Sequence, residues 1–200
     1  MGTMQYDVWS VSADSNVAYF RAAATIGAAG SLALLKANLG TNGYGYKVSF
    51  TSNGNDAGIT FTITGRQVGH IIGDPVVTET VTGPASNTVF SANYYSQVTS
   101  ITVSGTSVNN VSIGYGSNLA LPRTRIKGLY YVGGGSAGSI TVTSPNREFP
   151  LFKITTPDQA DSFADSLFIP SEGILVGGDA PNDNAVVTVS NVTSYTLICG

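Results

Sequence analysis

The stretch that decides the fold runs from Val98 to Gly116 and reads VTSITVSGTSVNNVSIGYG. In its first half, hydroxyl-bearing and β-branched residues alternate at a period of two, with Ile101 and Val103 on one face. This alternation is typical of a half-buried antiparallel strand, because successive side chains of a strand point to opposite faces of the sheet. A small polar turn and a second short strand follow, so the stretch predicts a β-hairpin.

A closely similar pattern ends the chain. Residues Val186–Gly200 read VVTVSNVTSYTLICG, again with alternating β-branched and hydroxyl residues around a short polar interruption. Two segments that close with the same hairpin predict two copies of a β module. We therefore expect an all-β fold of two tandem antiparallel β-sandwich or barrel-like modules with little helix.

The predicted domain boundaries follow from the position of these closing patterns. Residues 1–20 are predicted to form an N-terminal arm or first strand, and residues 21–116 a β-sandwich module. Residues 117–122 are the best candidate for a linker, because Pro122 cannot donate a hydrogen bond to a strand ladder. Residues 123–200 are predicted to form the second β module.

Most of the chain between these boundaries alternates in the same way. The predicted strands are 46–51, 59–65, 76–82, 126–132, 139–143, 151–154, 173–177 and 185–199. Two segments are different. Residues 21–39 fit either a strand at Ser31–Leu35 or a short helix, although Gly27 and Gly30 disfavour the helix. Residues 156–163 predict one turn of helix that begins at Thr156 as N-cap.

The polar surface carries few charges. Of the 200 residues, 42% are hydrophobic but only 10% are charged, against about 25% in typical globular domains. Ser, Thr, Asn and Gly must therefore supply most of the polar surface. Few charges give weak protection against edge-to-edge association of strands, so the composition favours a subunit of a homo-oligomer or larger assembly.

The charge balance and the single cysteine exclude several classes of protein. The net charge is −3, and Arg123, Arg125 and Lys127 form the one basic cluster, so we expect no nucleic-acid partner. No apolar run reaches membrane-spanning length and no signal peptide is visible at Met1–Ser10, so we expect no membrane partner. Cys199 has no second cysteine to pair with and is expected to be a small apolar core residue.

One glycine-rich segment matches two catalytic motifs by spacing. Residues Gly133–Gly138 read GGGSAG, which fits the dinucleotide-binding pattern G-x-G-x-x-G and the nucleophile elbow G-x-S-x-G centred on Ser136. Both motifs require a helix directly afterwards. Residues Ile140–Thr143 instead predict a strand, so we interpret the segment as a loop between two strands.

The remaining candidates for chemistry are also weak. The single histidine, with a carboxylate four residues on, has no nucleophile assigned to it by sequence, and one histidine and one cysteine are too few for a zinc site. Two Asn/Asp runs could bind calcium but lack EF-hand spacing, and one carboxylate pair could suggest glycoside cleavage. We interpret all of them as turns or solvated side chains, and predict no catalytic, cofactor-binding or metal-ligating residue; the residues considered are His70, Asp74, Asn53–Asp56, Asp179–Asn184, Asp161 and Asp165.

Two pairs of adjacent tyrosines fit two roles, packing on the sheet and binding of a sugar. Tyr94–Tyr95 and Tyr130–Tyr131 each lie in a predicted strand, so the two rings of a pair point to opposite faces. One ring of each pair could therefore be exposed and stack on a sugar, whereas packing on the sheet is the alternative.

Several motifs resemble those of one family. The run TSNGNDAGITFTITG at residues 51–65 resembles a strand–turn–strand element of tailed-phage virion proteins, as do TETVTGP at 78–84 and SIGYG at 112–116. The second half is similar to small phage structural domains through PSEGI at 170–174 and the closing strand YTLICG at 195–200, where Leu-Ile-Cys departs from the family's Tyr-Gly ending. The likeness covers residues 20–116 and, more loosely, 123–200.

This resemblance implies a non-enzymatic component of a virion. The expected role is a capsid decoration (cement) protein that bridges subunits of the major capsid protein, forming a trimer if it is a cement protein. The alternatives are a neck or tail component, such as a ring, tube or fibre-anchoring subunit, and a glycan- or receptor-binding virion module. The expected location is the virion.

Overall fold

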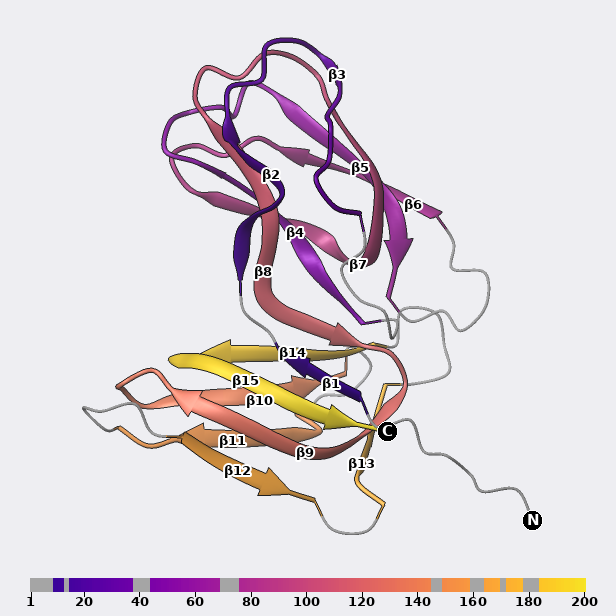
Figure 1. The fold of residues 1–200 in the computed structure, drawn as a ribbon, viewed down its shortest axis with the longest axis vertical. Coiled ribbons are helices and arrows are strands. Elements are labelled where there is room, and N and C mark those ends of the chain that lie inside the picture. The colour runs from indigo at the N-terminus through magenta and orange to yellow at the C-terminus, as the bar shows by residue number, and fades with distance from the viewer. Residues whose placement is uncertain are drawn as a thin grey trace. The chain divides into compact units, whose positions relative to one another are not determined.

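The structure, a computed structural model, describes residues 9–12, 15–37, 44–68, 76–144, 149–158, 164–169, 172–177 and 184–200. These residues form fifteen strands and no helix (Figure 1), which confirms the predicted all-β class. The strands divide between two compact units. We call Ser15–Ala120 the central unit, and Met1–Asp14 together with Leu121–Gly200 the terminal unit.

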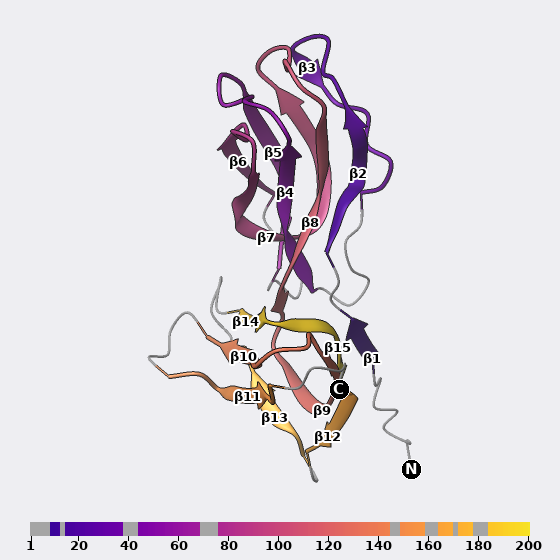
Figure 2. The ribbon, with the colours of Figure 1, turned by 90° about the vertical axis from the view of Figure 1, so that its left-hand side faces the viewer.

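The central unit is built from seven antiparallel strands. They are β2 (Asn16–Ala24), β3 (Gly30–Ser31), β4 (Gly45–Ser52), β5 (Thr60–Gln67), β6 (Val76–Thr82), β7 (Thr88–Val103) and β8 (Val111–Leu121). β4 lies between β8 and β7, β5 lies between β7 and β6, β2 pairs with β8, and β3 pairs with β7. Figure 2 shows the same strands from a second side.

The long strand β7 joins two layers of a sandwich. Its first half pairs with β4 and its second half pairs with β5, with Tyr95 at the change of partner. The rings of Phe50 on β4 and Phe61 on β5 stack with centroids 4.4 Å apart, and both side chains are fully buried. The two layers therefore face each other across a shared apolar core.

The predicted alternation is confirmed in the central unit, but the predicted hairpin is wrong. Ile101 and Val103 are buried as expected. However, this half of β7 pairs with β5, whereas β8 pairs with β4 and β2. The polar segment 104–110 thus connects strands that are not neighbours. Alternation shows which face of a strand is buried, but it does not show which strand is its partner.

The terminal unit contains eight strands. They are β1 (Trp9–Ser12), β9 (Thr124–Gly133), β10 (Gly138–Thr143), β11 (Phe152–Thr156), β12 (Ala164–Phe168), β13 (Ile174–Val176), β14 (Ala185–Ser190) and β15 (Val192–Cys199). One set of antiparallel pairs has the order β1-β15-β9-β12, with β13 also on β9, and another has the order β11-β10-β14. Both sets contribute buried side chains: Ile126, Leu129, Tyr131, Tyr195, Leu197 and Cys199 from the first, and Ile140, Val142, Ala185 and Val187 from the second.

The closing pattern of the chain is likewise not a hairpin. β14 pairs with β10, whereas β15 pairs with β9 and β1. Asn191 alone separates β14 from β15 and has a φ of 49°, a left-handed conformation that asparagine tolerates better than most residues. In both of the similar stretches, the strands before and after the polar interruption pair with different strands and not with each other.

The division into units differs from the predicted domain boundaries. β1 pairs with β15, which brings the first described strand into one unit with the C-terminal segments. The expected N-terminal arm, residues 1–20, is thus shared between β1 and β2. Residues 117–121 of the expected linker continue β8, and the boundary between the two units lies after Ala120, within residues 117–122.

The two predicted helical segments are also different in the structure. The described part of residues 21–39 contains the end of β2 and the two-residue strand β3, and no helix. Thr156, expected as a helix N-cap, is the last residue of β11. Residues 159–163 of that predicted turn lie outside the described residues.

Candidate functional site

One face of the central unit carries a regular array of hydroxyl groups. We call it the hydroxyl grid; it comprises Thr60, Thr62, Thr64, Thr78, Thr80, Thr82, Ser100, Thr102 and Ser104. β5 and β6 pair in unbroken register over seven residues, and Thr62 is opposite both Thr80 and Thr102. The hydroxyls of Thr62 and Thr80 lie 3.3 Å apart, and those of Thr64 and Thr78 lie 3.5 Å apart. None of the nine side chains is charged.

The charged residue of β6 faces the opposite way. Glu79 is the cross-strand partner of the fully buried Ile63, so it lies on the inner face of the sheet. Its carboxylate accepts hydrogen bonds from the backbone N–H and side-chain amide of Asn93, at 3.1 and 2.9 Å, and from Tyr95 Oη at 3.2 Å. It also accepts one from the backbone N–H of Ala92. The carboxylate therefore ties β6 to β7 and leaves the outer face of β6 uncharged.

Tyr95 holds its proton in this arrangement. Burial and the neighbouring charge of Glu79 raise the pKa of the Tyr95 phenol well above its ordinary value. The phenol therefore remains a hydrogen-bond donor to Glu79 at every ordinary pH. This contact stabilises the fold and leaves no proton available for acid–base chemistry near neutral pH.

The predicted Asn-Gly-Asn-Asp turn is organised around its own carboxylate. Asp56 is buried, and its oxygens accept hydrogen bonds from Ser52 Oγ at 2.7 Å and from the backbone N–H groups of Val108 and Asn109 at 2.7 and 3.1 Å. Burial raises the pKa of Asp56, but these hydrogen bonds outweigh burial and lower it overall. The carboxylate is thus engaged by protein donors, as expected of a structural turn.

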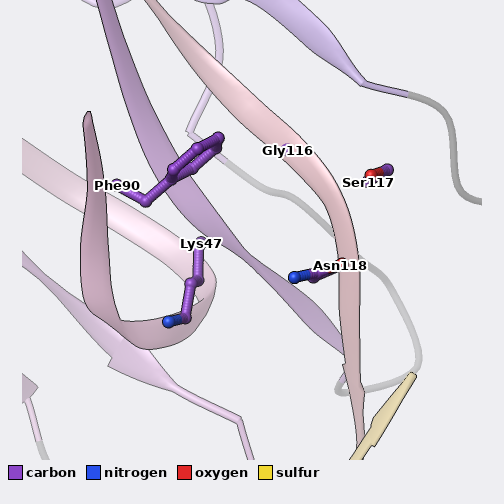
Figure 3. Close-up of a pocket in the computed structure, with 5 residues that line it drawn as sticks. All are labelled: Lys47, Phe90, Gly116, Ser117 and Asn118. Atoms are coloured by element: carbon purple, nitrogen blue, oxygen red, sulfur yellow. The ribbon is translucent and has the colours of Figure 1, made fainter. Parts of the chain in front are cut away.

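A small open hollow lies on the central unit at β4, β7 and β8. It has a volume of about 160 Å³ and is lined by Lys47, Phe90, Gly116, Ser117 and Asn118 (Figure 3). The Phe90 ring is 49% exposed and packs over Gly116, where a Cβ atom would lie 2.7 Å from the ring. Figure 3 shows the Ser117 side chain on the other side of β8, which leaves Lys47, Phe90 and Asn118 as the side chains around the hollow.

The terminal unit exposes an apolar edge. All five residues of β12 are exposed, and Phe168 is 72% exposed. Asp165, one of the carboxylates considered from the sequence, lies on this strand, and its Oδ1 accepts a hydrogen bond of 2.7 Å from the backbone N–H of Ser166.

In the basic cluster, Arg125 pairs with Glu172 at 3.7 Å. The cluster is therefore partly neutralised on β9.

The other predicted positions fall in three groups. Ser136 is exposed in the loop between β9 and β10, and no helix follows it, so the interpretation of Gly133–Gly138 as a loop is confirmed. Tyr95 and Tyr131 are buried while Tyr130 is 46% exposed, as expected for adjacent residues of a strand. Cys199 is fully buried in β15.

Several candidates cannot be placed. His70, Asp74, Asp161 and most of Asp179–Asn184 lie outside the described residues. Within the part of the chain that the structure describes, no three His, Cys, Asp or Glu side chains are grouped as metal ligands would be. The same described part contains no helix long and apolar enough to cross a membrane.

The sequence pattern alone does not predict the hydroxyl grid as a unit. Each of its three segments carries T-x-T-x-T or its serine equivalent, at 60–64, 78–82 and 100–104. What the sequence lacked was the register that aligns the three segments into rows. No family model, no curated protein and no solved structure matches the chain.

Proposed function

We propose that this protein is a non-enzymatic structural subunit of a tailed-phage virion, acting as a capsid decoration (cement) protein that bridges coat subunits. The observation that carries the proposal is the hydroxyl grid on the outer face of β5 and β6, which has one exposed charge, Arg66 at the end of β5, beside the uncharged outer face and edge of β6. Thr78, Thr80 and Thr82 are exposed on β6, and the strand's one carboxylate is turned inward and occupied. Such a surface suits protein–protein contact through sheet edges and faces better than it suits catalysis.

The phage setting comes from sequence resemblance. The segment 51–65 contains the turn at Asp56 and most of β5, the strand that carries Thr60, Thr62 and Thr64 of the hydroxyl grid. The motif that resembles phage proteins therefore overlaps the proposed contact surface. The proposed partners are the major capsid protein or other virion subunits, together with further copies of this chain. The proposed location is the virion.

Particles made with and without the gene test this proposal. We expect the protein in purified virions of the genome that encodes it, as extra density over the capsid lattice in hundreds of copies. Particles that lack the gene should lose this density and release DNA at a lower temperature. Copy numbers in multiples of six or twelve, with density at the neck or tail, would instead identify the protein as a neck or tail component. Absence of the protein from purified particles would contradict the whole proposal.

The hollow in Figure 3 supports a second candidate, a glycan-binding virion module. An exposed aromatic ring beside an amide and an ammonium group is a typical combination for sugar binding. On a host-polysaccharide panel, Phe90→Ala should abolish binding, whereas Val108→Ala, at a position that is 82% exposed, should leave it unchanged. Absence of binding by the wild-type protein across the panel would reject this candidate.

A further inference from the structure

The strand β6 is an open edge of the central unit. It is the last strand in its order among the described strands, and both views show it at the border of its sheet (Figures 1 and 2). The backbone N–H of Gly83 donates to the carbonyl of Ile59 at 2.8 Å. Residues whose backbone groups bond to the partner strand alternate along an antiparallel pair. The backbone N–H and C=O groups of Val81, Glu79 and Val77 therefore also point towards β5. The N–H and C=O groups of Thr78, Thr80 and Thr82 therefore point away from β5.

The edge at β6 is the longest of the described edges that pair without a register shift. Its seven residues pair with β5 without a register shift. β12 and β11 have five residues each, β1 has four, β13 has three and β3 has two. β2 has nine residues, but its pairing with β8 is interrupted by two register shifts. Regular edges of this length readily accept another strand.

The other long edges carry protecting groups that β6 lacks. On β12, Asp165 Oδ1 occupies the backbone N–H of Ser166. On β2, the guanidinium of Arg21 donates to three carbonyl groups, those of Ala24, Thr25 and Val111. β11 carries the exposed Lys153. Charged side chains are a usual means of blocking edge pairing, and on β6 the single charge is withdrawn to the inner face.

We infer that β6 pairs with β6 of a second copy of this chain, antiparallel, about a two-fold axis at Thr80. A two-fold contact requires a surface that is complementary to itself. With Thr80 opposite Thr80 of the partner subunit, Thr78 lies opposite the partner's Thr82, so the outward N–H and C=O groups match in pairs. Threonine pairs across strands stabilise antiparallel pairing, and the hydroxyl grid continues across the contact.

The position of Glu79 disfavours one of the two neighbouring registers. A shift that places Thr78 opposite the partner's Thr80 would put Glu79 opposite the partner's Glu79, and like charges directly opposite each other destabilise a sheet. With Thr80 on the axis, Glu79 lies opposite the partner's Val81 instead. Its carboxylate remains bound to Ala92, Asn93 and Tyr95 within its own subunit.

Sedimentation of purified protein tests the pairing. The wild-type protein should be a dimer, and Thr80→Pro should weaken dimerisation about 30-fold or more, because proline removes an outward N–H in each subunit. Thr62→Lys is the matched control, since Thr62 shares the face and the row of Thr80 but lies on the interior strand β5. This control should remain a dimer.

Cysteine cross-linking tests the register without relying on a proline. In a Cys199→Ala background, Thr80→Cys should form an intersubunit disulfide on mild oxidation, because paired strands bring such residues within disulfide range. Thr62→Cys should not. A monomeric wild-type protein, a dimer unaffected by Thr80→Pro, or equal cross-linking at both positions would overturn the inference. These outcomes do not depend on whether the protein is a virion component.

Discussion

The carboxylate of Asp56 accepts a hydrogen bond of 2.7 Å from the backbone N–H of Val108, 52 residues further along the chain. The same oxygen accepts a second bond from Asn109, and the other oxygen accepts one from Ser52. One side chain thus joins the loop before β5 to the loop between β7 and β8. Since these loops share no strand ladder, the carboxylate supplies the polar contacts between them.

This contact predicts an acid-sensitive contribution to stability. The pKa of Asp56 in the folded protein lies below its ordinary value of 3.8, so its stabilising contribution is complete above that value and is lost as the pH falls through the folded pKa. Asp56→Asn should therefore cost about 1–3 kcal/mol at neutral pH. Urea unfolding at neutral pH and at about pH 2.5 should show the gap between variant and wild type closing in acid. An equal gap at both values would contradict this account.

Two buried serines of β4 should respond in opposite ways to the same substitution. Ser52 Oγ donates to Asp56 and accepts from the backbone N–H of Gly54. Ser49 Oγ is buried and has no hydrogen-bond partner among the described residues. Ser52→Ala should cost about 1–3 kcal/mol, whereas Ser49→Ala should be neutral or stabilising by up to about 1 kcal/mol. Urea unfolding measures both, and a larger loss for Ser49→Ala would refute the assignment.

The turn at Asp56 shows what could be predicted from the sequence. Asn-Gly and Asn-Asp steps between two alternating segments are strong local signals, so the turn and the flanking strands β4 and β5 were predictable. The contact of Asp56 with Val108 was not, because it depends on where a distant loop arrives. Local signals fix local structure, whereas contacts between distant loops depend on the order in which strands pair.

Two glycines of the central unit should differ sharply in their tolerance of a methyl group. A Cβ atom on Gly114 of β8 would overlap the backbone carbonyl of Asn16 at the start of β2. Gly27 has open space around its Cα and needs no positive φ. Gly114→Ala should cost about 3 kcal/mol and speed hydrogen exchange in β2, whereas Gly27→Ala should change stability by less than about 1 kcal/mol. Equal melting temperatures for the two variants would contradict the close packing of β2 on Gly114.

The strand partners were the part of the fold that the sequence could not provide. The alternation of β7 identified Ile101 and Val103 as buried, and β6 was predicted with its observed bounds, Val76–Thr82. The alternation is the same whether the next strand pairs alongside or crosses to the other layer, so it predicts hairpins for both β7–β8 and β14–β15, which the strand partners exclude. For the same reason the hydroxyl grid became visible only when the register of β5, β6 and β7 was known.

The thiol of Cys199 should be inert in the folded protein. Cys199 is fully buried in β15, and burial raises the pKa of its thiol to about 12. Since the thiolate is the reacting species, reaction with an aromatic disulfide reagent at about pH 8 should be at least about 100-fold slower than for an exposed thiol. Unfolding in urea should restore ordinary reactivity.

A cysteine placed in an exposed loop provides the matched control. Ser136→Cys puts a second thiol between β9 and β10, where the side chain is exposed. This variant should show one rapidly reacting thiol and one protected thiol, and the protected thiol should react only when β15 unfolds. If both thiols reacted at the same rate in the native protein, β15 could not be part of the closed core of the terminal unit.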